Sequence, residues 1–402
     1  MVPGQDFTPA AVAASSGFDE AQAELLLEEL QDEHLVQQRT EGRYALHDLL
    51  RAHAAGYAAR DRAEERAATV RVLSWYQATA DGAAGRLFPS RYAWPSAQDP
   101  SAAVPAEFAD GAEAMAWYER EHQNLLAAVE RAATAVPDTD LAWRLATTLF
   151  SYLFVRCQWQ AGRRVHELGL ATALGAGDGA AEAWVRNNLG IFLTALGRPG
   201  EAAPQLTRAL EVRRELGDVS GEAATLSNLT RVFFESGQLD TALAYALQAL
   251  ATAQRAADRK RESSALNTVA ICLHEPGRPQ ESLAYLRRKL AMHRADGDLF
   301  GLGLALHNIA ELHEDQGQHE QVRAVLREAL GVARAAGDRH AGAGALFGIA
   351  RSLHAAGEPD AARPHLSAAL PLFEELGAPE LAEARALLGR LGGVYGNVRE
   401  TG

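Results

Sequence analysis

Apolar and polar positions recur along most of the chain with a period of forty residues. Each period holds two stretches in which apolar side chains return every three to four residues, the spacing of amphipathic helices. The turn between the two stretches carries a glycine in five successive units: Gly197, Gly237, Gly277, Gly317 and Gly357. The pattern predicts five helical hairpins over residues 181–396 and a degenerate sixth unit over residues 141–180.

Small residues mark fixed places within each unit. The first helix has a large apolar residue followed by a small one, as in Leu189-Gly190 and Ile309-Ala310, which lets neighbouring helices approach closely. A second glycine, usually followed by aspartate, ends each unit, as in Gly297-Asp298. This pattern resembles the tetratricopeptide repeat in a long form. Because one such unit cannot bury its own apolar face, the resemblance implies a right-handed α-solenoid with a concave binding groove.

Residues 1–56 follow a different pattern. Thr8-Pro9 is a helix-start signal, and residues 18–35 predict an amphipathic helix with Leu26, Leu27 and Leu30 facing inward. The segments "LVQQR" and "RYALH" flank a Thr-Glu-Gly turn and predict a β-hairpin, after which a helix begins near His47. The order helix, helix, hairpin, helix predicts a winged-helix domain. We therefore expect an all-α chain with a small β wing.

Charge and composition narrow the function. The chain carries a formal net charge of −13, whereas nucleic-acid binders need basic surfaces. The helix that would enter a DNA groove has no Lys or Arg between residues 19 and 33, so we do not expect direct DNA contact. Two cysteines without CxxC spacing indicate a reducing compartment, and no apolar run approaches the ~20 residues of a membrane span. We expect a cytoplasmic protein that does not cross a membrane.

Residues 57–140 predict an intermediate helical region with a proline-rich connection at residues 85–110, where Pro89, Pro95, Pro100 and Pro105 forbid a long helix. The region also contains "EAMAWYEREHQNLLAAVERAA" at residues 113–133. This segment is similar to a linker signature of actinobacterial antibiotic-pathway regulators of the SARP and AfsR-like type. The matching residues are Ala114, Trp117, Glu121, Asn124 and Leu125.

The N-terminal segment resembles the winged-helix subdomain that follows the nucleotide-binding core in NB-ARC (STAND-class) signalling ATPases. No GxxxxGK[ST] loop occurs in this sequence to cradle phosphates. The resemblance therefore implies that an NB-ARC core, binding ADP or ATP, lies upstream or on another polypeptide. No cofactor is expected in this chain itself.

His47-Asp48 has three interpretations. A metal-dependent HD phosphohydrolase needs further ligands, but His53 lies about 240° round the helix from His47 and no second His-Asp doublet occurs. A structural pair is the second interpretation, with Asp48 favoured in the first turn by the helix dipole. The third comes from the resemblance: Leu46-His47-Asp48 matches a Met-His-Asp-like tripeptide whose histidine contacts the β-phosphate of ADP. His47 would then sense nucleotide once the core is present.

Polar residues recur on the first helices of the repeats. An asparagine amide donates and accepts at once, which suits the backbone of a peptide in a groove. Kinesin-light-chain-type repeats look similar and use such asparagines. The alternative is that these asparagines cap or solvate helices. Charged residues follow the small position of several first helices. The predicted groove residues are Asn187, Asn188, Asn228, Arg231, Asn267, Asn308, Glu311 and Arg351.

No catalytic or metal site is expected. His307, Glu311 and Glu314 share a helix face and could in principle bind a metal, but we do not expect a metal site there. His313 takes a position that other repeats fill with large apolar residues, so we expect it to be packed in the core. We expect a sensor or scaffold that binds a peptide or protein in its groove and couples it to an NB-ARC core. The alternative is a free-standing tetratricopeptide adaptor or peptide-pheromone receptor without an ATPase. Homo-oligomer formation stays open.

Overall fold

The computed structural model describes residues 2–58, 60–89, 104–275 and 277–393. These residues form α-helices and one two-stranded antiparallel sheet, so the predicted all-α fold with a small β wing is confirmed. Most of the predicted proline-rich connection, including Pro95 and Pro100, lies outside the described residues. The chain consists of two compact units, Met1–Val232 and Phe233–Gly402.

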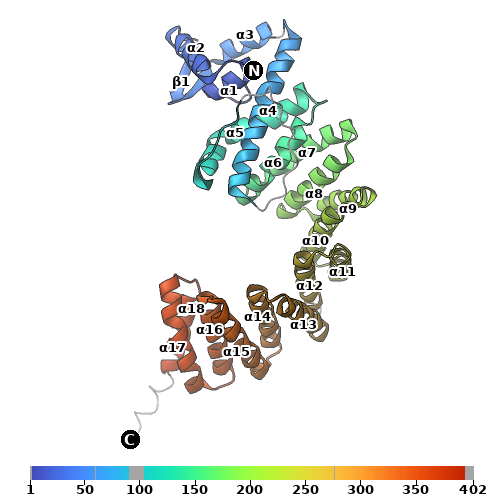
Figure 1. Ribbon diagram of the computed structural model, residues 1–402, viewed down its shortest axis with the longest axis vertical. Helices are drawn as coiled ribbons and strands as arrows, with labels where there is room; N and C mark the ends of the chain where they lie inside the picture. Colours follow the sequence, from blue (N-terminus) through green and yellow to red (C-terminus); the bar gives the residue numbers. More distant parts are fainter. Residues whose placement is uncertain (1, 59, 90–103, 276, 394–402) are drawn as a thin grey trace. The chain divides into compact units, whose positions relative to one another are not determined.

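The first unit begins with five short elements, which together we call the wing. Its elements are α1 (Pro9–Ser16), α2 (Glu20–Asp32), β1 (Val36–Thr40), β2 (Arg43–Leu46) and α3 (Asp48–Ala58) (Figure 1). Thr8 caps α1 by accepting a hydrogen bond from the Ala11 amide, as the Thr-Pro signal predicts. A small core forms from Phe7, Leu27, Val36 and Tyr44.

The prediction of three inward leucines on α2 was wrong in part. Leu27 is buried, but Leu26 and Leu30 are 40% and 39% exposed. The two-stranded sheet offers α2 a narrow surface, which is wide enough to cover one leucine row. The other leucines of α2 are left on the surface.

The rest of the first unit is helical. It contains α4 (Arg62–Leu87), α5 (Gly111–Ala135), α6 (Leu141–Val155), α7 (Trp159–Ala176), α8 (Gly179–Ala195), α9 (Pro199–Glu215) and most of α10 (Val219–Glu235). Its largest core cluster is aromatic at the centre, with Tyr76, Tyr118 and Phe192 fully buried. Tyr118 stacks on Tyr152, their ring centroids 4.6 Å apart.

The second unit continues the repeat. Its helices are α11 (Leu239–Arg255), α12 (Arg259–His274), α13 (Pro279–Asp296), α14 (Leu299–Asp315), α15 (His319–Ala336), α16 (Arg339–Ala355), α17 (Pro359–Leu376) and α18 (Leu381–Gly393) (Figure 1). Consecutive helices pack against one another throughout α11–α18.

The glycine-aspartate pairs explain why the helices end and restart in register. Gly337 ends α15 at a φ of +69°, a backbone conformation that glycine adopts without strain. Asp338 then caps α16, its Oδ1 accepting from the Ala341 amide at 2.9 Å. Gly297 and Asp298 do the same between α13 and α14. No helix of the described residues is long and apolar enough to cross a membrane.

Candidate binding site on the first helices of the repeats

The predicted groove residues are divided evenly between the two units. We call α8, α10, α12, α14 and α16 the first helices, because each opens a repeat. The first unit holds Asn187, Asn188, Asn228 and Arg231; the second holds Asn267, Asn308, Glu311 and Arg351.

In the first unit, an asparagine pair ties α8 to α10. Asn187 is 7% exposed, and its Oδ1 accepts from Asn228 Nδ2 at 2.9 Å and from Thr225 Oγ1 at 3.2 Å. Asn188 is also buried, and its Nδ2 has no hydrogen-bond partner in the described part of the chain. Arg231 is exposed. The Asn187–Asn228 pair thus joins two neighbouring repeats.

The second unit repeats this arrangement between α12 and α14. Asn308 Nδ2 donates to Asn267 Oδ1, and Lys289 Nζ donates to the same oxygen at 3.0 Å. Lys289 stands where the second helix of other repeats has a small residue, and it is buried. Burial lowers the pKa of its ammonium. The hydrogen bond to Asn267 satisfies this buried polar group.

Three predicted residues meet at a cavity between α12 and α14. This α12–α14 cavity has a volume of about 170 Å³, and helix α13 supplies its floor. Asn267, Asn308 and Glu311 line it, together with the exposed side chain of Ile271. The sequence therefore identified polar residues that the fold brings to one site.

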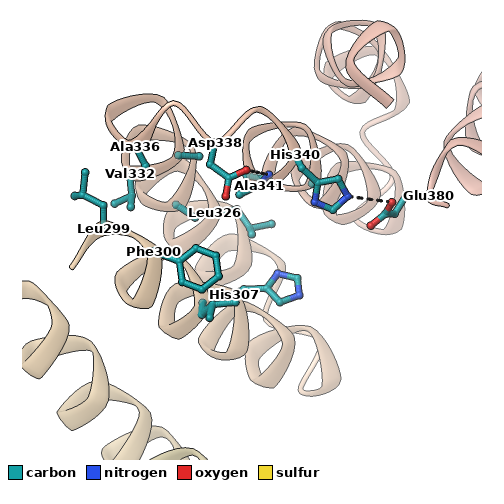
Figure 2. A pocket seen from close by; sticks show the side chains of 16 residues that line it. Leu299, Phe300, His307, Leu326, Val332, Ala336, Asp338, His340, Ala341 and Glu380 are labelled. Atoms are coloured by element: carbon teal, nitrogen blue, oxygen red, sulfur yellow. Dashed lines mark hydrogen bonds and ion pairs between the residues drawn. The ribbon is translucent and has the colours of Figure 1, made fainter. Parts of the chain in front are cut away.

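A second, larger cavity lies one repeat further along, between α14 and α16. This α14–α16 cavity has a volume of about 270 Å³ (Figure 2). It is lined by Leu299, Phe300, Gly303, Leu304, His307, Leu326, Ala329, Val332, Ala333, Ala336, Asp338, His340, Ala341, Gly344, Ala345 and Glu380. None of the predicted site residues is among them.

The α14–α16 cavity had a signal in the sequence. Gly344 occupies a repeat position that holds Trp184, Ala224, Ser264 and Leu304 in the other units. A Cβ atom added at Gly344, or at Gly303 on the facing helix, would meet no atom within 4 Å. The missing side chains leave the space between the two helices open.

Charged side chains surround this cavity. His307 Nε2 lies 3.4 Å from Glu311 Oε1. The hydrogen bond between them raises the pKa of His307 and lowers the pKa of Glu311. On the opposite wall, His340 Nε2 lies 3.4 Å from Glu380 Oε2 (Figure 2). Arg351 lies outside the cavity and donates to Glu314 at 2.6 Å.

His47 belongs to the first unit and lies immediately before helix α3. The residue is exposed, and its carbonyl oxygen accepts from the Arg51 amide at 2.8 Å. Asp48 follows as the first residue of α3. Among the described residues, no three His, Cys, Asp or Glu side chains are gathered so that they could hold a metal ion.

The linker signature residues all lie on the buried face of α5. Ala114, Trp117, Glu121, Asn124 and Leu125 are each at most 8% exposed. Their spacing along the helix puts them on one side of it. The apolar members pack into the core, while the two polar members face the wing.

Glu121 and Asn124 bind the wing through a polar network that we call the wing network. Arg43 of β2 forms ion pairs with Glu121 and, at 2.5 Å, with Asp6. The hydroxyl of Tyr76 on α4 donates to Glu121 Oε2 at 3.1 Å, and Asn124 Nδ2 donates to the same oxygen at 2.7 Å. Hydrogen bonding to Arg43 lowers the pKa of Asp6, and burial followed by the charge of Glu121 raises the pKa of Tyr76.

Sequence comparison identifies the repeats. The tetratricopeptide-repeat family matches residues 183–217, 221–295 and 301–375. The chain is 32% identical over 227 residues to the regulatory protein AfsR of Streptomyces griseus, covering 53% of this chain and 22% of that protein. It is 28% identical over 236 residues to AfsR of Streptomyces coelicolor, covering 48% of this chain and 24% of that protein. The matched part thus spans less than a quarter of these relatives.

One solved structure shares the fold over nearly the whole chain. It is a signal transduction ATPase with numerous domains (STAND protein) with a tetratricopeptide-repeat sensor, from Pyrococcus horikoshii. The TM-score is 0.54 at 12% identity, with 98% of this chain and 58% of that chain covered. Residues 183–375 therefore contain tetratricopeptide repeats, and about half of the chain is similar to the AfsR regulatory proteins, in agreement with the resemblance seen in the sequence.

Proposed function

We propose that this chain is the non-catalytic sensor and scaffold segment of a cytoplasmic signal-transduction regulator. It binds a peptide or protein partner on the first helices of its repeats and couples binding to an NB-ARC nucleotide-binding core outside the chain. The observation that carries this proposal is the pair of cavities on either side of α14, one repeat apart. Two open sites at the repeat spacing suit a ligand that runs across successive repeats.

Exposed apolar side chains beside these cavities support partner binding. Ile271 on α12 is 47% exposed, and Phe300 and Leu304 on α14 are 69% and 47% exposed. Single exposed apolar residues are ordinary, but a set gathered around concave sites is typical of interaction surfaces.

Helix α3 supports a partner for the wing. None of its side chains is buried, and Leu49 and Tyr57 are 80% and 64% exposed. Leu25 on α2 is 62% exposed. A helix with uncovered apolar residues favours an additional domain packed on it. We propose that the NB-ARC core covers this face, with His47 contacting the nucleotide at the start of α3.

The wing network supports coupling within the first unit. Glu121 is 3% exposed and ties β2 to the helices that lead into the repeats. A ligand shifts a two-state equilibrium only if it binds the two states unequally. The wing network connects the wing to α4 and α5, so a conformational change of these helices on partner binding would also move the wing.

Photo-cross-linking tests the partner-binding proposal. A benzophenone amino acid replacing Ile271 should cross-link a discrete protein or peptide in native lysate, because this side chain borders the α12–α14 cavity. The same amino acid replacing Ala284, which is exposed on α13, is the matched control. Mass spectrometry identifies the adducts. Equal labelling patterns at the two positions would contradict the proposal.

Nucleotide retention tests the role of His47. In a polypeptide that includes the upstream core, His47→Ala should reduce the ADP that co-purifies with the protein by about tenfold, the loss expected for one charge-assisted contact. His53→Ala, a change of another exposed histidine six residues further along the chain, should leave the ADP content unchanged. Equal ADP in wild type and His47→Ala would leave His47 with a structural role.

The competing function is a free-standing adaptor or peptide-pheromone receptor. The two cavities of the second unit fit this function as well, because binding a peptide there does not require a nucleotide-binding core. The gene sequence upstream distinguishes the two functions. An in-frame phosphate-binding loop supports the regulator, whereas a stop codon without such a loop supports the adaptor.

A further inference from the structure

We propose that the α14–α16 cavity anchors one large apolar side chain of the partner and that its acidic wall holds a basic residue next to that side chain. The inference rests on the proposed partner-binding function and deepens it. It assigns the occupant as a peptide segment in which a residue such as leucine adjoins an arginine or lysine.

The size and lining of the cavity favour a side chain over a free small molecule. Leu299, Phe300 and Leu304 of α14 and Val332 of α15 supply apolar walls (Figure 2). The volume of about 270 Å³ lies below the ~300–1,000 Å³ of sites that enclose drug-sized ligands. A pocket of this size instead suits an anchor residue, which contributes most when it fills a desolvated pocket.

The charges of the wall determine which residue lies next to the anchor. Asp338 and Glu380 both line the cavity. Glu380 Oε2 is shielded from solvent and accepts no hydrogen bond in the described residues. It lies 3.4 Å from His340 Nε2, the same separation as in the His307–Glu311 pair. A guanidinium or ammonium group of the partner would donate the hydrogen bond that the oxygen lacks, and such a charge-assisted bond is stronger than the long contact with His340.

The remaining charges agree with a basic neighbour. The histidine on the other wall, His307, already pairs with Glu311. The chain as a whole carries a net charge of −13, which attracts cationic segments. An acidic peptide would instead bring a carboxylate against Glu380 and Asp338.

Peptide titration tests this assignment on the intact chain. The probes are blocked peptides with a Gly/Ser background and a central Leu-Arg, Leu-Glu or Ala-Arg pair. Isothermal titration calorimetry should give the tightest binding for Leu-Arg. Replacing either member of the pair should weaken binding about tenfold, the effect of losing one anchor contact.

Two substitutions with matched controls localise the binding. Gly344→Leu fills the cavity and should weaken Leu-Arg binding about tenfold. Gly331→Leu places the same side chain in open space on α15 outside the cavity and should leave binding unchanged. Glu380→Gln should weaken binding about threefold and reduce its dependence on salt, whereas Glu320→Gln should do neither.

Three results would overturn the anchor site. They are no Leu-Arg binding up to about 1 mM, equal binding of the Leu-Glu peptide, or equal binding by Gly344→Leu and Gly331→Leu. The cross-linking experiment at Ile271 separates this failure from failure of the proposed function. A partner captured there that binds Gly344→Leu as it binds wild type supports the partner-binding function and rejects the anchor site.

Discussion

Asn187, one of the predicted groove residues, also joins two neighbouring repeats of the first unit. Its Oδ1 accepts from both Asn228 and Thr225 inside the first unit. Asn187→Ala should lower the free energy of unfolding by about 1–2 kcal/mol, because it removes the acceptor of the half-buried Asn228 amide, whereas Thr225 Oγ1 can still donate to the Gly221 carbonyl oxygen at 3.0 Å. Asn188→Ala removes an amide nitrogen that has no partner and should cost less than half as much. Urea unfolding measures both, and equal losses would refute the assignment.

His166 makes the free energy of unfolding of the first unit depend on pH. It is fully buried against Phe192, its Nδ1 lies 2.8 Å from the Gly162 carbonyl oxygen, and burial lowers its pKa from 6.5 to about 4. The unfolded chain therefore binds more protons between these two values. The stabilising effect is complete above the unfolded pKa and is lost as the pH falls toward the folded pKa.

The expected loss between pH 7 and pH 5 is about 2 kcal/mol of the free energy of unfolding. Urea titrations at the two pH values measure it. His166→Phe has no titratable group and should remove about that part of the pH dependence. An unchanged dependence in this variant would show that other groups cause it.

At the residue scale, the sequence predicted where the asparagines recur but not which hydrogen bonds they form. The asparagines fall in two series offset by one residue, Asn187 and Asn267 in one and Asn188, Asn228 and Asn308 in the other. Each observed pair joins one member of the first series to a member of the second in the next repeat. The period of the repeat predicts which helices are neighbours. The rotation that turns two amides toward each other depends on the packing of the helices.

Within helices, the same substitution should have opposite effects at different glycines. A Cβ atom at Gly190 of α8 would lie 2.5 Å from Leu206 Cγ on α9, and Leu206 is completely buried. Gly190→Ala should therefore destabilise the first unit by about 1–3 kcal/mol through overpacking. Gly331→Ala on α15 meets open space and should stabilise the second unit by about 0.5–1 kcal/mol, since alanine is the better helix former.

Thermal unfolding of the two variants measures this contrast. A gain in stability for Gly190→Ala would mean that α8 and α9 separate at little cost. The sequence predicted the close approach, because small residues follow a large apolar residue in each first helix. It did not predict the α14–α16 cavity. The cavity exists because Gly303 of α14 and Gly344 of α16 have no side chain to fill the space between the two helices.

Across the first unit, the wing network joins segments far apart in the sequence. Asp6, Arg43, Tyr76 and Glu121 come from four different segments. Glu121→Ala leaves the largely buried Arg43 with one of its two carboxylates, and breaking a buried ion pair typically costs about 3–5 kcal/mol. Hydrogen exchange of the backbone amides in residues 6–46 should accelerate accordingly.

A double-mutant cycle with Arg43→Ala provides the control. If the two residues act through one another, the double variant should lose less stability than the sum of the single variants. Additive losses would show that Glu121 and Arg43 act separately. The linker signature identified Glu121 and Asn124 as a matched pair in sequence. Their contact with the wing required the three-dimensional arrangement.

The two cavities that share α14 also set a spacing rule for the partner. Packed helices lie about 8–10 Å apart. The two cavities are also displaced by about 12 Å along α14, because residues 299–307 line one and residues 308–315 line the other. Their centres are thus about 15 Å apart, which an extended chain advancing about 3.3 Å per residue spans with about four to five residues. A segment that fills both cavities should carry its apolar anchor and its polar anchor at that interval. The spacing of the two cavities thereby predicts the number of residues between the two anchors, and candidate ligand sequences can be searched for that interval.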